Sequence, residues 1–193
     1  MEENLMNKVC ELLLIGGSAG SLEVLFKLLP LLRADLPFPV ALVLHRRNSA
    51  DSSLSNLLAS KTLNPTHEVE DKEAIVPGTI YLTPADYHLL IEHDRTFSLD
   101  YSEKVHFSRP SIDVTFESAA EVYGSKLVAI LLSGANEDGT SGLVAVKQVG
   151  GTAVVQNPET AQMPFMPHNA MMHSQVDHVF DTMQMAAFIN SLA

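Results

Sequence analysis

Residues 9–32, VCELLLIGGSAGSLEVLFKLLPLL, decide the fold class of this chain. The apolar run at 9–15 predicts a buried strand. The glycine-rich turn GGSAG follows at 16–20, and leucines at helical spacing then predict a helix over 21–32, which Pro30 kinks or ends. A buried strand that turns directly into a helix indicates a parallel sheet built through crossover connections.

The same alternation of strands and helices continues to the end of the chain and predicts an α/β domain. Short apolar strands are expected at 40–44, 79–82, 127–132, 152–156 and 176–180, and helices at 52–61, 111–123, 141–149, 167–173 and 182–192. Two alternating segments, 88–92 and 96–101, predict a β-hairpin. The predicted fold is a three-layer, doubly wound, mostly parallel β-sheet flanked by helices, with an antiparallel hairpin at one edge. We expect a single domain over 1–193, with residues 1–8 as a tail.

The composition favours a protein of the cytoplasm. The 193 residues include 23 acidic and 12 basic side chains, and the net charge of −11 argues against a general nucleic-acid or anionic-membrane binder. The single cysteine, Cys10, excludes a disulfide framework within the chain. The acidic N-terminus does not resemble a signal peptide, and no apolar run reaches the roughly 18 residues that a spanning helix needs, so we expect no membrane insertion.

The turn after the first strand carries a candidate nucleophile. Gly16, Ser18 and Gly20 have the G-x-S-x-G spacing of a nucleophile elbow, in which a sharp turn exposes the serine oxygen. The backbone N–H of Ala19 would lie at the helix N-terminus, where it can bind an oxyanion. A dinucleotide-binding fingerprint does not fit, because two of its three glycine positions hold other residues, and the lysine of a P-loop is absent. A turn with a purely structural role stays an alternative.

His45 and Asp138 are the candidate partners of Ser18. A serine nucleophile needs a hydrogen-bonded base that a third group orients. His45 ends the second predicted strand, where it faces either the serine or water. Asp138 follows the strand at 127–132, where it either orients the histidine or caps a helix.

Alternatives exist for both partners. Glu137 competes with its neighbour Asp138, and the backbone N–H of Ala135 in the same loop is a second candidate oxyanion donor. Ser18, Asp138 and His168 would give the residue order of the α/β-hydrolases. Against that family, the serine here follows the first strand, so no earlier strand loop can donate the second oxyanion N–H.

Seven motifs follow one another along nearly the whole chain, from about Leu12 to the C-terminus. They are IGGSAG at 15–20, a histidine ending its strand at 45, PGTIYLTPAD at 77–86, RPSIDV at 109–114, LSGANEDG at 132–139, GGTAVVQN at 150–157 and MP at 166–167. Together they resemble the catalytic domain of the chemotaxis protein-glutamate methylesterase, the CheB family. Several motifs in the right order are more specific than any one loop.

The resemblance implies a role for individual residues. The family's nucleophile falls on Ser18, its base on His45 and its orienting acid on Asp138. The implied reaction is hydrolysis of glutamate γ-methyl esters on the cytoplasmic helices of methyl-accepting chemotaxis receptors, with release of methanol. Some members also deamidate receptor glutamines, and no metal or organic cofactor is implied.

The chain departs from the family pattern at several positions near these residues. Alanine replaces threonine at Ala19, serine replaces glycine at Ser21, arginines replace Met-Pro at Arg46 and Arg47, glutamate replaces asparagine at Glu137, and phenylalanine replaces glycine at Phe165. Because the three proposed catalytic residues are all kept, we expect activity, with an altered rate and substrate choice.

Control and recognition are less determined by the sequence. A receiver domain needs on the order of 100 residues, which do not precede the first strand, so we expect none, and a separate regulatory partner is an alternative. Arg109 is a candidate for binding acidic receptor side chains, against a salt bridge beside the helix at 111–123. The competing functions are an inactive receptor-binding module and a serine hydrolase of small esters.

Overall fold

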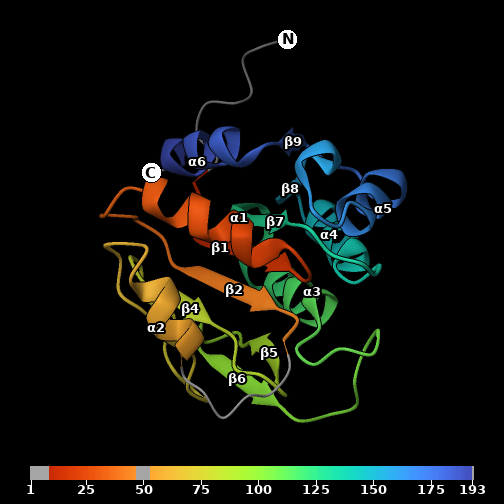
Figure 1. Ribbon diagram of the computed structural model, residues 1–193. Coiled ribbons are helices and arrows are strands. Elements are labelled where there is room, and N and C mark those ends of the chain that lie inside the picture. The colour runs from red at the N-terminus through yellow and green to blue at the C-terminus, as the bar shows by residue number, and fades with distance from the viewer. Residues whose placement is uncertain (1–8, 47–52, 193) are drawn as a thin grey trace.

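In the described part of the chain, seven parallel strands form the central layer (Figure 1). The computed structural model describes residues 9–46 and 53–192, so the predicted tail, Arg47 and the first residue of the helix predicted at 52–61 lie outside the described residues. The strands are β1 Leu12–Gly17, β2 Val40–Leu44, β3 Thr66–Glu68, β4 Ile80–Leu82, β7 Leu127–Leu131, β8 Thr152–Gln156 and β9 His178–Phe180. Their order in the sheet is β3-β4-β2-β1-β7-β8-β9, and every pair is parallel.

Helices cover both faces of this sheet. They are α1 Ser21–Leu28, α2 Ser53–Ala59, α3 Ile112–Tyr123, α4 Thr140–Gln148, α5 Phe165–His173 and α6 Thr182–Ser191. Short 3₁₀ turns lie at Leu29–Leu31, Gly124–Lys126 and Pro158–Thr160. Within residues 9–46 and 53–192, no helix has the length and hydropathy that crossing a membrane requires.

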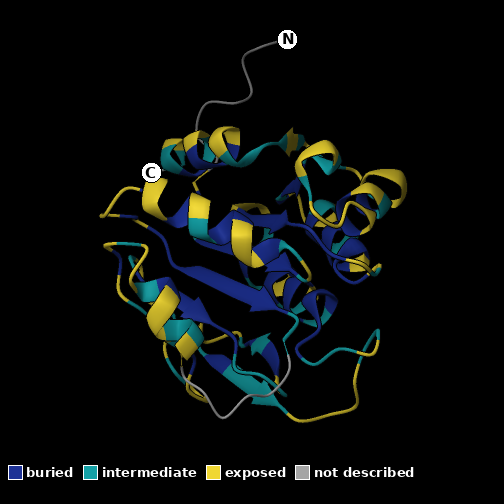
Figure 2. Cartoon of the chain, viewed as in Figure 1, coloured by how far each residue is buried: buried dark blue, intermediate teal, exposed yellow. Residues whose placement is uncertain are grey.

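The three layers arise because successive side chains of a strand point to opposite faces. Leu13 and Ile15 of β1 pack with residues of α1, α2 and α6, whereas Leu12 and Leu14 pack with residues of α3, α4 and α5. All residues of β1 are buried, and Figure 2 shows the sheet as a buried layer between helices whose outer surfaces are exposed. The core therefore consists of two apolar clusters, one on each face of the sheet.

Strand β1 lies where the strand order reverses. From β1 the chain continues to β2 and β4 on one side, and β7, β8 and β9 follow on the other side. Loops that leave the carboxyl ends of strands at such a point diverge, which leaves a crevice for ligands. Ser18, His45 and Asp138 follow β1, β2 and β7, so all three candidate residues belong to this edge.

The predicted order of strands and helices is confirmed, with shifts at their ends. The helix predicted at 21–32 ends at Leu28, and Pro30 lies in the 3₁₀ turn that follows. The helix predicted from residue 111 begins at Ile112, because the Ser111 side chain accepts a hydrogen bond from the Val114 N–H and caps the helix.

Two features of the sheet region differ from the prediction. Strand β3 was not predicted, because it has three partly exposed residues and no apolar run. The hairpin strands, β5 His88–Ile91 and β6 Phe97–Asp100, form a separate two-stranded sheet instead of joining the edge of the large one. Leu89 and Phe97 of the hairpin are buried in the cluster that includes α3.

Candidate active site

Ser18 and His45 end neighbouring strands at the carboxyl edge of the sheet. Gly17 of β1 pairs in register with Leu44 of β2, and the His45 N–H donates to the Gly17 carbonyl at 3.0 Å. Ser18 and His45 are therefore the next residues along two strands that lie about 4.8 Å apart. Both residues line a pocket of about 200 Å³.

Glycines shape the turn around Ser18 for two different reasons. Gly20 has a φ of 83°, a conformation that residues with a side chain rarely adopt, and it directly precedes α1. At Gly16 the limit is space, since a Cβ there would lie 2.5 Å from Cγ2 of Ile112. The start of α3 thus packs directly on the backbone of β1, which brings α3 next to the candidate site.

Asp138 is fully buried and caps a helix that is distant in the sequence. Its carboxylate accepts five hydrogen bonds, from the Ser111 hydroxyl, from the backbone N–H groups of Ile112, Asp113 and Gly139, and from the His45 ring. The sequence offered capping and orienting a histidine as alternatives, and the structure shows a contact of each kind. The capped helix is α3, whereas α4, which follows Asp138 directly, has no side-chain cap.

These hydrogen bonds decide the charge of Asp138 and the proton position on His45. Burial by itself raises the pKa of Asp138, but hydrogen bonds from His45 and from two backbone N–H groups outweigh it, so the pKa lies below its usual value. The ionised carboxylate accepts from Nε2 of His45 at 2.6 Å. Nε2 therefore carries the ring proton, and Nδ1 is the nitrogen with a free lone pair.

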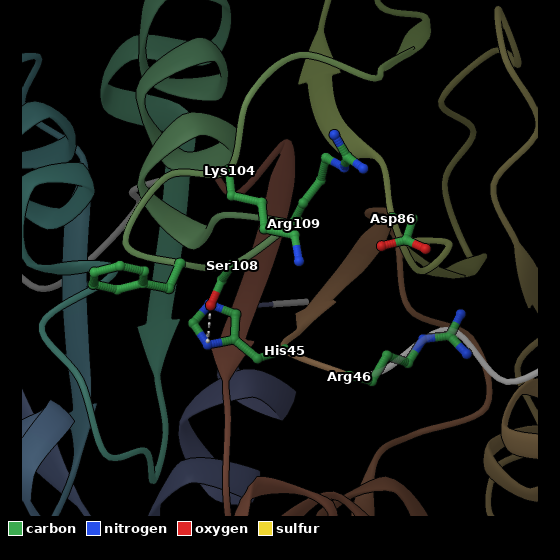
Figure 3. A pocket seen from close by; sticks show the side chains of 7 residues that line it. His45, Arg46, Asp86, Lys104, Ser108 and Arg109 are labelled. Atoms are coloured by element: carbon green, nitrogen blue, oxygen red, sulfur yellow. Dashed lines mark hydrogen bonds between the residues drawn. The ribbon is translucent and has the colours of Figure 1, made fainter.

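The free ring nitrogen of His45 faces a serine that the sequence analysis did not single out. Oγ of Ser108 lies 3.3 Å from Nδ1 (Figure 3). Within the described residues, the Ser18 side chain makes no hydrogen bond to the His45 ring. The structure thus joins His45 to Asp138 and Ser108, and places Ser18 beside them without a direct hydrogen bond. The position of Ser108 directly before the RPSIDV motif was the one available signal.

Two backbone N–H groups near Ser18 are available for an oxyanion. In the described parts of the chain, the N–H groups of Ala19 and Ala135 donate no hydrogen bond. Ser133 holds the two loops together, since its hydroxyl donates to the Ala19 carbonyl at 2.7 Å and its carbonyl accepts from the Ser18 N–H at 2.9 Å. Donors from the β1 and β7 loops are therefore present on the same edge as Ser18.

A second buried carboxylate, Asp113, lies next to Asp138. Its Oδ1 accepts from the Gly142 N–H at 2.6 Å, and its Oδ2 lies 3.2 Å from Nε2 of His106. Burial raises the pKa of Asp113 to about 6, with the Gly142 hydrogen bond opposing this shift and the charge of Asp138 adding to it. Glu137 lies 3.3 Å from the other nitrogen of His106, so it does not take the place of Asp138.

His106, Asp113 and Asp138 are residue types that bind metals, but the oxygens of Asp138 are already occupied by hydrogen bonds. A nitrogen of His106 and oxygens of Asp113 and Asp138 lie within 4.8 Å of one another. Both oxygens of Asp138 already accept hydrogen bonds, and a cation there would have to displace those donors. The group is therefore best described as a hydrogen-bonded ionic cluster that supports the start of α3.

Arg109 is held by the loop that precedes it. Its Nη1 donates to the Tyr101 and Ser102 carbonyls at 3.4 and 2.7 Å, and its guanidinium carbon lies 3.7 Å from the centre of the Tyr101 ring. The salt bridge considered as an alternative is not formed among the described residues. Arg109 also lines a pocket of about 420 Å³ together with His45 and Ser108 (Figure 3).

The fold and the site together define a doubly wound α/β protein with a histidine and a buried carboxylate joined at the carboxyl edge of its sheet. The model of the CheB methylesterase family matches residues 13–189. A Leptospira interrogans protein, named as a candidate protein-glutamate methylesterase/protein-glutamine glutaminase, is 43% identical and covers 91% of both chains. The protein-glutamate methylesterase/protein-glutamine glutaminase of Thermotoga maritima is 34% identical over 88% of this chain and 50% of its own.

A solved structure agrees with these sequence relatives. The crystal structure of the Thermotoga maritima CheB methylesterase catalytic domain has a TM-score of 0.91 and 32% identity, and covers 95% of this chain and 99% of that one. The chain spans about half the length of the Thermotoga maritima methylesterase/glutaminase and nearly all of the solved catalytic domain. It belongs to the CheB methylesterase family, and the resemblance seen in the motifs is confirmed.

Proposed function

We propose that this protein hydrolyses glutamate γ-methyl esters on the cytoplasmic helices of chemotaxis receptors, giving glutamate and methanol. The observation that carries the proposal is the 2.6 Å contact between His45 and the buried Asp138, at the strand ends beside Ser18. An oriented base next to a serine is what acyl transfer from an ester requires. The methylesterase names of the relatives support the choice of ester.

In the proposed first step, Ser18 attacks the ester carbonyl while Nδ1 of His45 takes its proton. Ser108 occupies Nδ1 in the free protein through a long hydrogen bond of 3.3 Å, which Ser18 replaces by rotation of its side chain. A bond forms between Oγ of Ser18 and the carbonyl carbon, and the carbonyl oxygen becomes an oxyanion. The N–H groups of Ala19 and Ala135 bind this oxygen.

The second half of the reaction releases both products. The bond from carbon to the methoxy oxygen breaks, the His45 imidazolium returns the proton to that oxygen, and methanol leaves a glutamyl ester on Ser18. Water deprotonated by His45 attacks this ester, and Ser18 leaves with the proton. Asp138 keeps Nδ1 directed at the reacting groups and stabilises the imidazolium. The same steps on a glutamine side chain release ammonia, which agrees with the glutaminase part of the relatives' names.

Two competing functions differ from this one in specific results. An inactive receptor-binding module does not react with a fluorophosphonate, which labels an activated serine. A hydrolase of small esters reacts with the fluorophosphonate but releases no methanol from receptors.

Control by a separate partner and a single-domain organisation over 1–193 both stay predictions.

The proposal is tested by incubating the protein with receptor membranes that carry labelled methyl groups and collecting the volatile methanol. We expect wild-type protein to release the label, and Ser18→Ala to lower the rate by about 10⁴-fold or more. Leu63→Ala serves as a control, because this exposed residue precedes β3 at the opposite edge of the sheet and should leave the rate unchanged. Absence of methanol with the wild type, or an undiminished rate with Ser18→Ala, would contradict the proposal.

A further inference from the structure

The loop before α3 contains a tight turn next to the proposed active site. Val105 and Ser108 exchange two backbone hydrogen bonds, of 3.1 and 2.9 Å, so His106 and Phe107 form a two-residue turn between them. Their φ angles are 48° and 60°. Turns of this kind favour glycine or asparagine at both positions, and a phenylalanine there is conformationally unfavourable.

The turn is anchored at two points and open between them. His106 lies 3.2 and 3.3 Å from two carboxylates, and Ser108 contacts His45. The Phe107 side chain between these anchors is 98% exposed. The anchors fix the backbone of the turn, so the aromatic ring is held in solvent next to the pocket that it lines with His45. A single exposed apolar residue is ordinary on its own, so the surroundings of the turn decide its meaning.

Cationic side chains surround the turn in a protein whose net charge is −11. Arg46, Lys104 and Arg109 line the pocket of about 420 Å³ beside His45, and Asp86 is an acidic residue in its wall. Figure 3 shows Lys104 and Arg109 above the His45 ring, with Arg46 and Asp86 to its right. Arg46 is already ion-paired, whereas Lys104 and Arg109 pair with no carboxylate among the described residues.

We propose that residues 104–109, here named the substrate loop, recognise an acidic helical segment around the ester-bearing glutamate. Lys104 and Arg109 bind carboxylates one helical turn from the ester, and Phe107 packs on an apolar side chain of the same segment. Side chains three or four residues apart on a helix lie about 5–6 Å from one another, so one face can meet the pocket and the turn together. This inference rests on the proposed function, since the ester must reach Ser18 for its neighbours to meet the loop.

Charge complementarity favours an acidic segment over a neutral or basic one. The net charge of the protein repels acidic partners, whereas this pocket has two cations that pair with no carboxylate in the described part of the chain and can attract such partners. Opposite charges across an interface raise the association rate and fix the register of the partner. Among the described residues neither Lys104 nor Arg109 is in an ion pair, so binding a carboxylate breaks no such pair, although Arg109 already donates to two backbone carbonyls.

The test measures the binding of two fluorescent peptides by anisotropy. Each peptide carries one glutamate γ-methyl ester; one has glutamates three and four residues away, and the other has glutamines there. All proteins carry Ser18→Ala, which prevents hydrolysis during the measurement. We expect the acidic peptide to bind about 10-fold more tightly at low ionic strength, with most of this preference lost near 1 M salt.

Variants of the substrate loop separate the contributions of charge and of the aromatic ring. Lys104→Glu is expected to reduce the preference for the acidic peptide below about 2-fold, whereas Lys104→Arg keeps it. Phe107→Ala is expected to lower the binding affinity for both peptides by about 5-fold. Lys61→Glu and Leu63→Ala are the matched controls, because both residues are exposed and precede β3 at the opposite edge of the sheet.

Each outcome separates this inference from the proposed function. Equal binding of the two peptides, or a wild-type preference in the Lys104→Glu protein, overturns the role of the loop. With Ser18 restored, methanol release can be measured from both ester peptides. Equal kcat/KM values for the two peptides also overturn the role of the loop, but they leave the proposed function intact. Selective binding without methanol release refutes the proposed function and leaves the loop as a recognition element.

Discussion

The His45 ring lies between two regions that are built in opposite ways. On one side, the buried Asp138 carboxylate accepts five hydrogen bonds and joins the ring to the start of α3. On the other side, the substrate loop holds Phe107 in solvent, and Lys104 has no acidic partner within residues 9–46 and 53–192. The buried side fixes the proton and orientation of the His45 ring, whereas the exposed side, in our proposal, completes its contacts only with a partner.

The largest expected effect comes from breaking the buried side. Asp138→Ala leaves several donors unpaired in the core, so we expect the free energy of unfolding to fall by about 3–5 kcal/mol. We also expect kcat to fall by about 10⁴-fold, because the His45 tautomer is no longer fixed. Urea unfolding and methanol release measure the two effects.

Asp181→Ala is the matched control for this comparison. Asp181 also caps a helix, α6, through a capping box, but it lies at the surface. Removing this cap should lower the free energy of unfolding by about 1 kcal/mol and leave the rate of methanol release unchanged. Similar losses of stability in the two variants would show that the burial of Asp138 has no special importance.

The close packing of β1 on α3 is expected to give the next largest effect. Gly16→Ala places a Cβ 2.5 Å from Cγ2 of Ile112, so α3 must move and carry with it the N–H groups that hold Asp138. We expect the free energy of unfolding to fall by about 1–3 kcal/mol and the rate of methanol release to fall as well. Adding Ile112→Ala makes room for the new methyl group, and a double-mutant cycle should show partial recovery relative to the sum of the two single changes. Strict additivity would argue against this contact.

The stability of the buried side should depend on pH through Asp113. The folded protein raises the pKa of Asp113 to about 6, from an ordinary value of 3.8. Between these values the unfolded chain has released the proton and the folded protein has not, so the contribution of this group to stability falls as pH rises and stays low above pH 6. Asp113→Asn keeps an acceptor for Gly142 and removes the charge.

The difference in stability between Asp113→Asn and wild type is therefore the quantity to measure. We expect it to shift in favour of the variant by on the order of 1–3 kcal/mol between pH 4 and pH 7. Urea unfolding at several pH values gives this difference directly. A difference that is constant with pH, or that shifts in favour of wild type, would show that the Asp113 carboxyl is not protonated in the folded state near pH 5.

The smallest effect is expected on the exposed side, at Ser108. Among the residues that the structure describes, its hydroxyl makes only long hydrogen bonds, 3.3 Å to the His45 ring and 3.4 Å to the His106 carbonyl. Ser108→Ala should therefore cost less than about 1 kcal/mol in stability and less than about 10-fold in kcat. A loss of kcat as large as that of Ser18→Ala would identify Ser108 as the nucleophile.

Local patterns in the sequence were sufficient to predict the parallel core. Strand β1 is a continuous apolar run, helix α1 has leucines at helical spacing, and Val40–Leu44 and Thr152–Gln156 match the predicted strands end to end. The candidate residues Ser18 and His45 could be placed together because both end strands expected to be neighbours. Strand β3 could not be predicted, since three partly exposed residues carry no periodic signal.

Local sequence patterns did not predict the contacts between segments that are distant in the sequence. Asp138 lies just before α4 in the chain, but it caps α3, which begins 26 residues before it. Ser108 reaches His45 through a loop whose path depends on how His106 contacts Asp113. Such contacts depend on tertiary packing, and no spacing within the sequence encodes them.

In the proposed mechanism Ser18 is the nucleophile, although Ser108 is the serine hydrogen-bonded to His45 in the free protein. A fluorophosphonate probe tests this directly, because it forms a covalent bond with an activated serine, and peptide mass spectrometry then locates the label. We expect Ser18 to be labelled in wild type and in Ser108→Ala, and we expect Ser18→Ala to take up no label. A label on Ser108, in wild type or in Ser18→Ala, would contradict it.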